Sequence, residues 1–311
     1  MTKTMRVFVT GATGFIGSAI CKELIAAGHQ VLGLSRSAAG ADALQALGAS
    51  VQRGDLEDAA SLVAGARACD AVIHMAFIHD FSDIERNVRV DREAISTMLD
   101  ALAGTDKAFV GTNGTLQVAG ADFLSAAQPA GGGRLAVETD RAPVGKGLYG
   151  RSANEHLAID AAARGIRTSV VRLPPTVHGA GDKGFIPMVI GASREHGAAG
   201  YVGDGANVWP TVHRTDAARL YRLAIEQVPA GTVLHAAAEQ GVAWRDIAEV
   251  ISNGTGLPTR SLAPADAAAH FGWMAGVVST NNPTSSAATQ KLLGWKPTEP
   301  GLLADMRAHY F

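Results

Sequence analysis

The stretch "VTGATGFIG", residues Val9 to Gly17, decides the fold. It stands where an apolar, strand-like run ends and an amphipathic, helix-like run begins. In such a turn the first glycine permits a tight bend, the second lets the backbone approach a pyrophosphate, and the third lets the helix pack against the strand. The helix start presents unpaired N–H groups and the positive end of its dipole to the phosphates. We therefore expect a dinucleotide to be bound by Gly11, Ala12, Thr13, Gly14, Phe15, Ile16 and Gly17.

Short apolar runs alternate with helical stretches through the first half of the chain. Strand-like runs, rich in β-branched residues, occupy residues 6–10, 30–34, 71–75, 108–111 and 168–173. Between the first two, apolar residues recur at helical spacing from Ile16 to Ala27, and Gly28 closes the helix. Repeated strand–helix–strand units require right-handed crossovers and a parallel sheet covered on both faces. The sequence thus predicts an α/β fold with a Rossmann-type, doubly wound parallel sheet.

The regular alternation of strand-like and helix-like segments ends after Leu173. We expect a loop over residues 174–187, helices over 215–227 and 243–251, and one more strand within 231–238. The glycine-rich residues 128–145 are expected to form either a lid over an active site or a surface loop without order. We therefore divide the chain into a dinucleotide-binding Rossmann domain, residues 1–175, and a smaller substrate-binding region, residues 176–311, that partly returns to the Rossmann core.

Composition limits the classes of function. The chain has 311 residues, of which 47% are apolar and 18% charged, as in globular proteins. A formal net charge of −2 gives no reason to expect a nucleic acid or an anionic membrane as partner. No apolar run approaches the ~20 residues of a membrane span, and no cluster of side chains has metal-ligand spacing. We expect a cytoplasmic monomer or homodimer without a metal, in which Cys21 and Cys69 are reduced, structural thiols.

Several motifs together resemble one enzyme superfamily. The spacing in "GATGFIG" is similar to that of the short-chain dehydrogenases/reductases, in particular their extended and atypical branches, the relatives of nucleotide-sugar epimerases and dihydroflavonol reductases. The resemblance continues in "GDLED" (54–58), "AVIHMAF" (71–77), "VETDRAPVGKGLYGRSANE" (137–155), "VVRLPPTVHGAGD" (170–182) and "LGWKPT" (293–298). It implies a nicotinamide cofactor and hydride transfer to or from a small-molecule substrate.

The end of the second strand indicates which nicotinamide cofactor is used. An enzyme that prefers NAD carries an acidic residue there, which accepts hydrogen bonds from the ribose 2′-hydroxyl. This chain instead has Ser35, Arg36 and Ser37. A guanidinium forms charge-assisted bonds to a 2′-phosphate, whereas a carboxylate repels it. We therefore expect NADP(H), the alternative being that Arg36 is a solvated loop arginine.

The resemblance implies further contacts with the cofactor. Asp55 is expected to accept from the adenine amine or to cap the helix that follows it. Asn87 resembles a helix asparagine that braces the active-site backbone through a water molecule. The remaining expected contacts are Leu56, Met75, Ala76, Phe77, Thr112, Pro174 and Val177.

The catalytic residues implied by the resemblance are incomplete. In the family a Ser or Thr after the fifth strand holds the substrate oxygen, a Tyr transfers the proton, and a Lys four residues on lowers the pKa of that Tyr. Tyr149 matches the proton donor, but the lysine position is Ala153. Thr112 and Thr115 are both candidates for the hydroxyl, with Gly114 near the usual position. We favour Thr115, the alternative being a turn-forming role.

The missing lysine raises the question whether Arg151, His178 or His213 takes part in catalysis. Arg151 lies only two positions beyond Tyr149 and is expected on a different side of the helix from position 153, so it is not expected to substitute. A histidine, His178 or secondarily His213, is the alternative proton donor, since an imidazole titrates in the useful range. Each of these histidines has a structural role as its alternative.

Three functions follow from these residues. The first is NADPH-dependent reduction of a small or medium carbonyl (or imine) compound, because a phenol near its intrinsic pKa of ~10 donates a proton more readily than it removes one. The second is nucleotide-sugar epimerase or dehydratase chemistry, which needs the activated tyrosine. The third is a non-catalytic NADP(H)-binding sensor.

Overall fold

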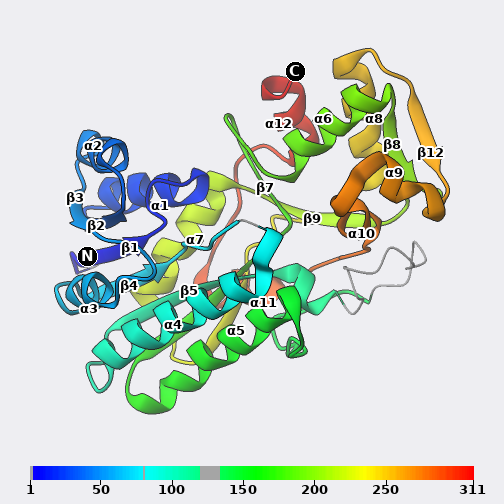
Figure 1. The fold of residues 1–311 in the computed structure, drawn as a ribbon. Coiled ribbons are helices and arrows are strands. Elements are labelled where there is room, and N and C mark those ends of the chain that lie inside the picture. The colour runs from blue at the N-terminus through cyan, green and yellow to red at the C-terminus, as the bar shows by residue number, and fades with distance from the viewer. Residues whose placement is uncertain (1–2, 80, 120–133) are drawn as a thin grey trace.

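The central sheet contains seven parallel strands, and the predicted doubly wound α/β fold is confirmed. The computed structural model describes residues 3–79, 81–119 and 134–311 (Figure 1). The sheet order is β10-β6-β5-β4-β1-β2-β3, so the chain reverses its direction of travel across the sheet between β1 and β4. Its strands are β1 (Arg6–Thr10), β2 (Gln30–Ser35), β3 (Ser50–Arg53), β4 (Ala71–His74), β5 (Ala108–Gly114), β6 (Arg167–Leu173) and β10 (Thr232–His235).

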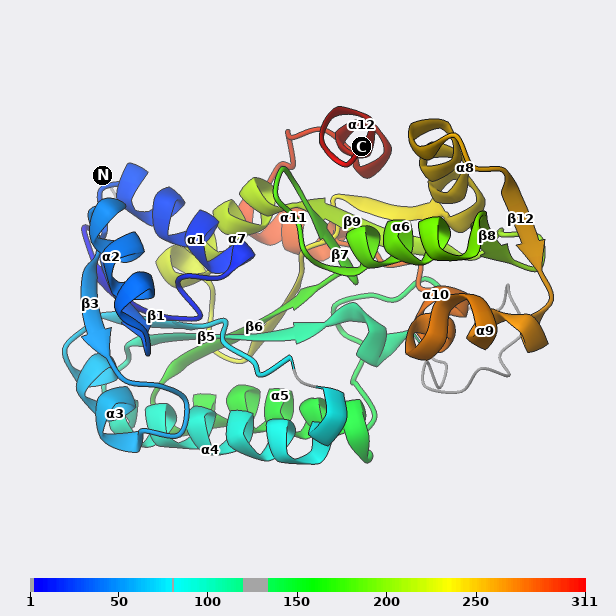
Figure 2. The same ribbon diagram turned by 45° about the horizontal axis from the view of Figure 1, so that its top comes forward.

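Helices cover both faces of this sheet (Figure 2). One face carries α1 (Phe15–Ala26), α2 (Ala38–Ala46), α7 (Arg214–Gln227) and α11 (Ala287–Leu293). The other carries α3 (Ala59–Arg67), α4 (Ile84–Leu102) and α5 (Gly150–Asp160). Because both faces are covered, the strands are apolar on both sides, as in β1, where Val7, Phe8 and Val9 are fully buried.

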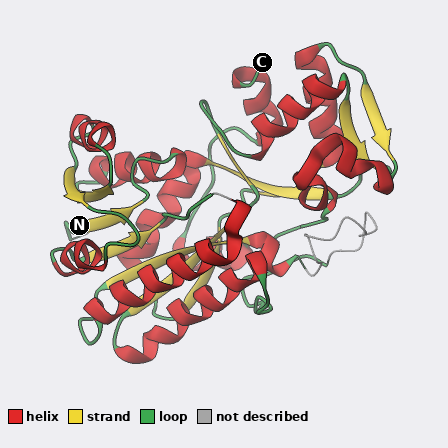
Figure 3. Ribbon diagram, in the orientation of Figure 1, coloured by secondary structure: helices red, strands yellow, loops and turns green. Residues whose placement is uncertain are grey.

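A second lobe lies beyond the carboxyl ends of the strands (Figures 1 and 3). Its core contains Trp209 and Trp244, whose ring centroids are 4.5 Å apart. The strands of this lobe are β7 (Thr176–His178), β8 (Ala199–Val202), β9 (Val208–His213), β11 (Glu239–Ala243) and β12 (Thr259–Leu262). The helices are α6 (Phe185–His196), α8 (Trp244–Thr255), α9 (Ala267–Phe271), α10 (Ala275–Ser279) and α12 (Leu302–His309). Short 3₁₀ helices lie at Phe81–Asp83, Thr115–Val118, Gly147–Tyr149, Ala161–Arg164, Pro264–Asp266 and Gly272–Met274.

Some predictions about individual segments were wrong. Residues 174–187, predicted as a loop, contain β7 and the start of α6. This strand forms because Val177 pairs in register with Val212 of β9, a partner distant in sequence. Residues 128–133 of the glycine-rich segment lie outside the described residues, and beyond them Ala136 forms a β-bridge with Thr284.

The two cysteines are buried in separate parts of the core and form no disulfide. Burial raises the pKa of Cys69 to about 11, so this thiol is protonated at neutral pH. Among the helices of the described residues, none combines the length and apolar character required to cross a membrane.

The turn from β1 into α1 depends on two glycines. Gly11 has a φ of +68°, a left-handed conformation that side chains disfavour. A Cβ on Gly17 would lie 2.0 Å from the Gly11 carbonyl oxygen. The helix therefore approaches the end of the strand more closely than any other residue at position 17 would allow.

We predict that Gly17→Ala destabilises the protein by about 1–3 kcal/mol, the usual cost of forcing an extra carbon into a packed site. The matched control is Gly191→Ala in α6, where a Cβ meets nothing within 4 Å and alanine favours the helix by up to about 1 kcal/mol. Urea unfolding of both variants measures the difference. A Gly17→Ala protein as stable as the wild type would contradict this account of the turn.

Candidate active site

The phosphate cradle lies where the sheet order reverses, at the carboxyl ends of β1 and β4. Helix α1 begins after Gly14, and its first turn has neither a capping side chain nor an acidic residue. Its N–H groups and positive dipole end are therefore left to an anionic ligand. A Cβ on Gly11 would lie 2.9 Å from the backbone nitrogen of Ala76, so the cradle and the loop after β4 are in contact. These features fit the pyrophosphate of a dinucleotide.

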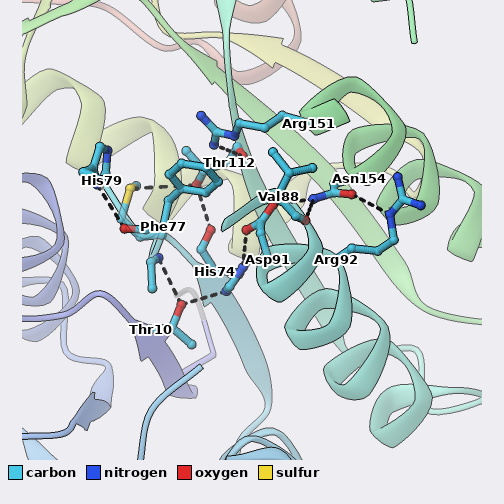
Figure 4. Close-up of polar contacts among 12 residues, drawn as sticks. Thr10, His74, Phe77, His79, Val88, Asp91, Arg92, Thr112, Arg151 and Asn154 are labelled. Carbon is cyan, nitrogen blue, oxygen red and sulfur yellow. Dashed lines mark hydrogen bonds and ion pairs between the residues drawn. The ribbon is translucent and has the colours of Figure 1, made fainter. Parts of the chain in front are cut away.

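A chain of buried hydrogen bonds starts directly below the cradle (Figure 4). The Thr10 hydroxyl accepts from the backbone N–H of Ala76 at 3.2 Å and lies 2.8 Å from Nδ1 of His74. The other ring nitrogen of His74 lies 3.1 Å from Oδ1 of Asp91 in α4. With Asp91 ionised, Nε2 of His74 is the donor to the carboxylate.

The same chain reaches the helix that follows Tyr149. The side-chain amide of Asn154 in α5 donates to Oδ2 of Asp91 at 2.7 Å and to the Val88 carbonyl at 3.0 Å. Nε of Arg92 donates to the Asn154 carbonyl oxygen at 3.0 Å. Burial alone would raise the pKa of Asp91, but the hydrogen bonds from His74 and Asn154 hold it below its usual value. The carboxylate is therefore a charged, fully bonded link between β4, α4 and α5.

The turn after β2 carries two arginines. Arg36 is exposed, and within the described residues no carboxylate lies at ion-pair distance from it. Arg53, at the end of β3, pairs in register with Ser35 and donates to the Arg36 carbonyl at 2.9 Å. Ser37 caps α2 by accepting from the Gly40 N–H at 3.0 Å. Sequence reasoning missed Arg53, which the in-register pairing of two neighbouring strands places against the backbone of Arg36 and Ser37.

Asp55 and Leu56 lie in the turn after β3. The Asp55 carboxylate is exposed and accepts from the backbone N–H groups of Glu57 and Asp58, at 2.9 and 3.1 Å. The cap of α3 is Asp58, which accepts from the Ser61 N–H, so the alternative that Asp55 caps this helix is wrong. The role of Asp55 toward adenine stays a prediction.

Thr112 joins the ends of β4 and β5. Its hydroxyl donates to the His74 carbonyl at 2.8 Å and lies 2.8 Å from the hydroxyl of Tyr221 in α7. Because the Thr112 hydroxyl has a single proton, Tyr221 is the donor in the second bond. Burial raises the pKa of Tyr221, so this phenol is protonated and structural.

Thr115, the other candidate for the hydroxyl, and Gly114, near the usual position, differ in their surroundings. Thr115 is fully buried, and its hydroxyl accepts from the side-chain amide of Asn282 at 2.9 Å. Gly114 has an extended backbone, and a Cβ there would meet its nearest neighbour, the Leu173 carbonyl oxygen, at 3.8 Å. Position 114, nearest to where the family carries its hydroxyl, thus has room for a side chain but is a glycine. Thr115 is held in the core.

Tyr149 lies between the two lobes. It ends the 3₁₀ turn that precedes α5, is partly buried, and packs with Leu116 and Phe185 against the core of the second lobe. Ala153, one helical turn further on, is also partly buried. On the neighbouring α4, the predicted brace Asn87 is buried.

Arg151 lies beside two of the expected cofactor contacts, Thr112 and Phe77, and that it does not replace the missing lysine stays a prediction. Its NH2 group donates to the Thr112 carbonyl at 3.2 Å, and its guanidinium carbon lies 4.3 Å from the centre of the Phe77 ring (Figure 4). Arg151 and Ala153 both lie in α5, so the helical rotation that separates their side chains holds. His79, which sequence reasoning also missed, lies on the same loop and makes an edge contact with Phe77.

The histidines are held in the second lobe. His178 lies in β7, is buried, and places Nδ1 at 2.9 Å from the Asp305 carboxylate of α12. Its ring contacts that of His213 edge-on at 5.4 Å. This environment favours the structural role for His178 over that of proton donor. Of the other residues predicted after β6, Pro174 is buried and Val177 partly buried.

Comparisons with known proteins agree with this geometry. The chain is 42% identical to an uncharacterised protein of Schizosaccharomyces pombe over 302 residues, covering 97% of this chain and 98% of the relative. It is 27% identical to a 2-alkyl-3-oxoalkanoate reductase of Stenotrophomonas maltophilia over 280 residues, covering 83% and 73%. A dTDP-glucose 4,6-dehydratase from Streptomyces venezuelae, solved with NAD and TYD bound, has a similar fold, with a TM-score of 0.76, 19% identity, and coverage of 98% and 95%.

The model of one family matches residues 7–237, which include the cradle, the buried chain and Tyr149. With this match over more than half of its length, the chain belongs to the NAD dependent epimerase/dehydratase family.

Proposed function

We propose that the protein is an NADPH-dependent oxidoreductase that reduces a small or medium carbonyl (or imine) compound. The observation that carries the proposal is the placement of Tyr149 between the lobes, on the helix tied to the dinucleotide cradle, with Ala153 in place of a lysine. The reductase among the relatives supports the direction of the reaction.

Each group of residues has one task in this proposal. The N-terminal turn of α1 binds the pyrophosphate, and Arg36 and Arg53 bind the 2′-phosphate. NADPH, when bound, supplies the hydride that adds to the carbonyl carbon. Tyr149 donates its phenolic proton to the oxygen, completing the C–H and O–H bonds of the alcohol, and solvent then returns a proton to the phenolate. Phe185, partly buried against the core of the second lobe, forms part of the apolar wall on that side.

The missing lysine favours reduction over epimerase or dehydratase chemistry. Those reactions begin by oxidising the substrate, which requires the phenolate form of the tyrosine as a base. A reduction begins from the protonated phenol, the form that prevails without an adjacent ammonium group. Since Gly114 and Ala153 both lack the expected side chains, a non-catalytic NADP(H)-binding sensor is the second candidate.

Consumption of NADPH in the presence of a panel of aldehydes, ketones and imines, followed by absorbance, tests the proposal. We expect catalysed turnover, and a fall of ~10²-fold or more in Tyr149→Phe with NADPH affinity unchanged, as for loss of a general acid. Binding without turnover would favour the sensor. If Tyr149→Phe keeps the full rate while His178→Ala abolishes it, the histidine is the acid and Tyr149 only a wall of the pocket.

The choice of cofactor is tested through the turn after β2. We expect NADPH to bind more tightly than NADH, because only NADPH offers a dianion to Arg36 and Arg53. The double substitution Ser35→Asp with Arg36→Asn should reverse this order, which calorimetric titration measures. Equal affinities of the wild-type protein for NADPH and NADH would contradict the proposed preference for NADPH.

A lysine introduced at position 153 should change the balance between carbonyl reduction and alcohol oxidation. We expect Ala153→Lys to raise the rate of alcohol oxidation with NADP⁺ by about tenfold or more near neutral pH, because an ammonium beside the phenol stabilises the phenolate. Ala153→Met is the matched control, since it adds a chain of similar length without charge. The idea fails if both variants oxidise the alcohol at the same rate.

A further inference from the structure

Arg151 is a partly buried cation without a counterion among the described residues. Its Nε atom is buried and finds no hydrogen-bond partner, and of the five N–H donors of the guanidinium only one has an acceptor among the described residues, the Thr112 carbonyl. In that part of the chain no carboxylate lies within ion-pair distance of it. Asp91 contributes charge from further away but is already bonded to His74 and Asn154.

Such an arrangement is costly unless a ligand completes it. Burial lowers the pKa of Arg151, and the charges of Asp91 and Glu155 offset this effect only in part. Buried polar groups in folded proteins nearly always have partners, and those without one often mark a functional site. The cation–π contact with the Phe77 ring, 4.3 Å from the guanidinium carbon to the ring centre, holds the remaining donors beside the loop after β4.

The position of Arg151 identifies the part of the dinucleotide that it meets. The cradle lies at the reversal point between β1 and β4, and the adenosine end extends toward β2, where Arg36 and Arg53 lie. Arg151 lies on the opposite side, above Phe77 after β4 and beside Thr112 in β5. A dinucleotide whose pyrophosphate occupies the cradle therefore places its nicotinamide half beside Arg151. The acceptors available there are the hydroxyls of the nicotinamide ribose.

We propose that Arg151 binds the nicotinamide ribose and that its charge favours the reduced cofactor. The inference rests on the proposed function, because it requires the same cleft to hold NADPH. The oxidised nicotinamide ring carries a positive charge and the reduced ring does not, so a fixed guanidinium nearby repels NADP⁺ more than NADPH. An arginine two positions after Tyr149 thus supplies a cation for the ribose, whereas position 153, from which a lysine would lower the pKa of the phenol, stays uncharged.

Calorimetric titrations with NADPH, NADP⁺ and adenosine 2′,5′-bisphosphate test this, since the last ligand lacks the nicotinamide half. We expect Arg151→Met to weaken NADPH binding about tenfold, as for loss of one or two hydrogen bonds to a charged group, and to lower the NADPH-to-NADP⁺ affinity ratio. Binding of the bisphosphate should be unchanged. Arg151→Lys keeps the charge and should recover the ratio.

The matched control is Arg164→Met, which removes an exposed arginine paired with Asp100 at the far end of the same helical segment. It should leave all three affinities unchanged. The proposal is overturned if Arg151→Met binds NADPH as tightly as the wild type. It is also overturned if the bisphosphate loses affinity in parallel, because Arg151 would then support the cradle. Failure of the wild type to bind any of the three ligands would instead remove the proposed function itself, and this inference with it.

Discussion

The hydrogen-bonded chain from Thr10 through His74 and Asp91 to Asn154 is the constraint on which the site depends. All four side chains are buried, so a lost bond leaves its partner without water as a substitute, at a cost of about 1–3 kcal/mol. The chain begins one residue before the phosphate cradle and ends five residues after Tyr149. It therefore ties the phosphate cradle to the helix that follows Tyr149.

Around this frame the cations lie on either side of the cradle. Arg36 follows β2, Arg53 ends β3 and Arg151 lies beside Thr112 in β5, while the start of α1 between them has no acidic side chain. Under the proposed function the first two bind the adenosine end of the dinucleotide and Arg151 the nicotinamide end. On the side of the second lobe Tyr149 packs with Phe185, whose ring contacts the buried Trp209 edge-on. The neutral carbonyl substrate of the proposed function suits these apolar surroundings.

Much of the first lobe could be predicted because buried parallel strands are continuous apolar runs, and β1, β2, β4, β5 and β6 were expected close to their observed bounds. Strand β7 could not be predicted, because its three residues form a strand only by pairing with β9. The sequence predicts a loop at His178, because the partner that holds it, Asp305, is 127 positions away. The contact of Arg151 with the Thr112 carbonyl could not be predicted, because the two residues lie 39 positions apart in the sequence.

A crystal structure of the protein with NADP⁺ bound tests the central claim most directly. The account predicts the pyrophosphate at the start of α1, the 2′-phosphate within hydrogen-bond distance of Arg36 or Arg53, and C4 of the nicotinamide facing the space beside the Tyr149 hydroxyl. A nicotinamide whose C4 faces away from Tyr149, or a 2′-phosphate without contact to either arginine, would contradict it.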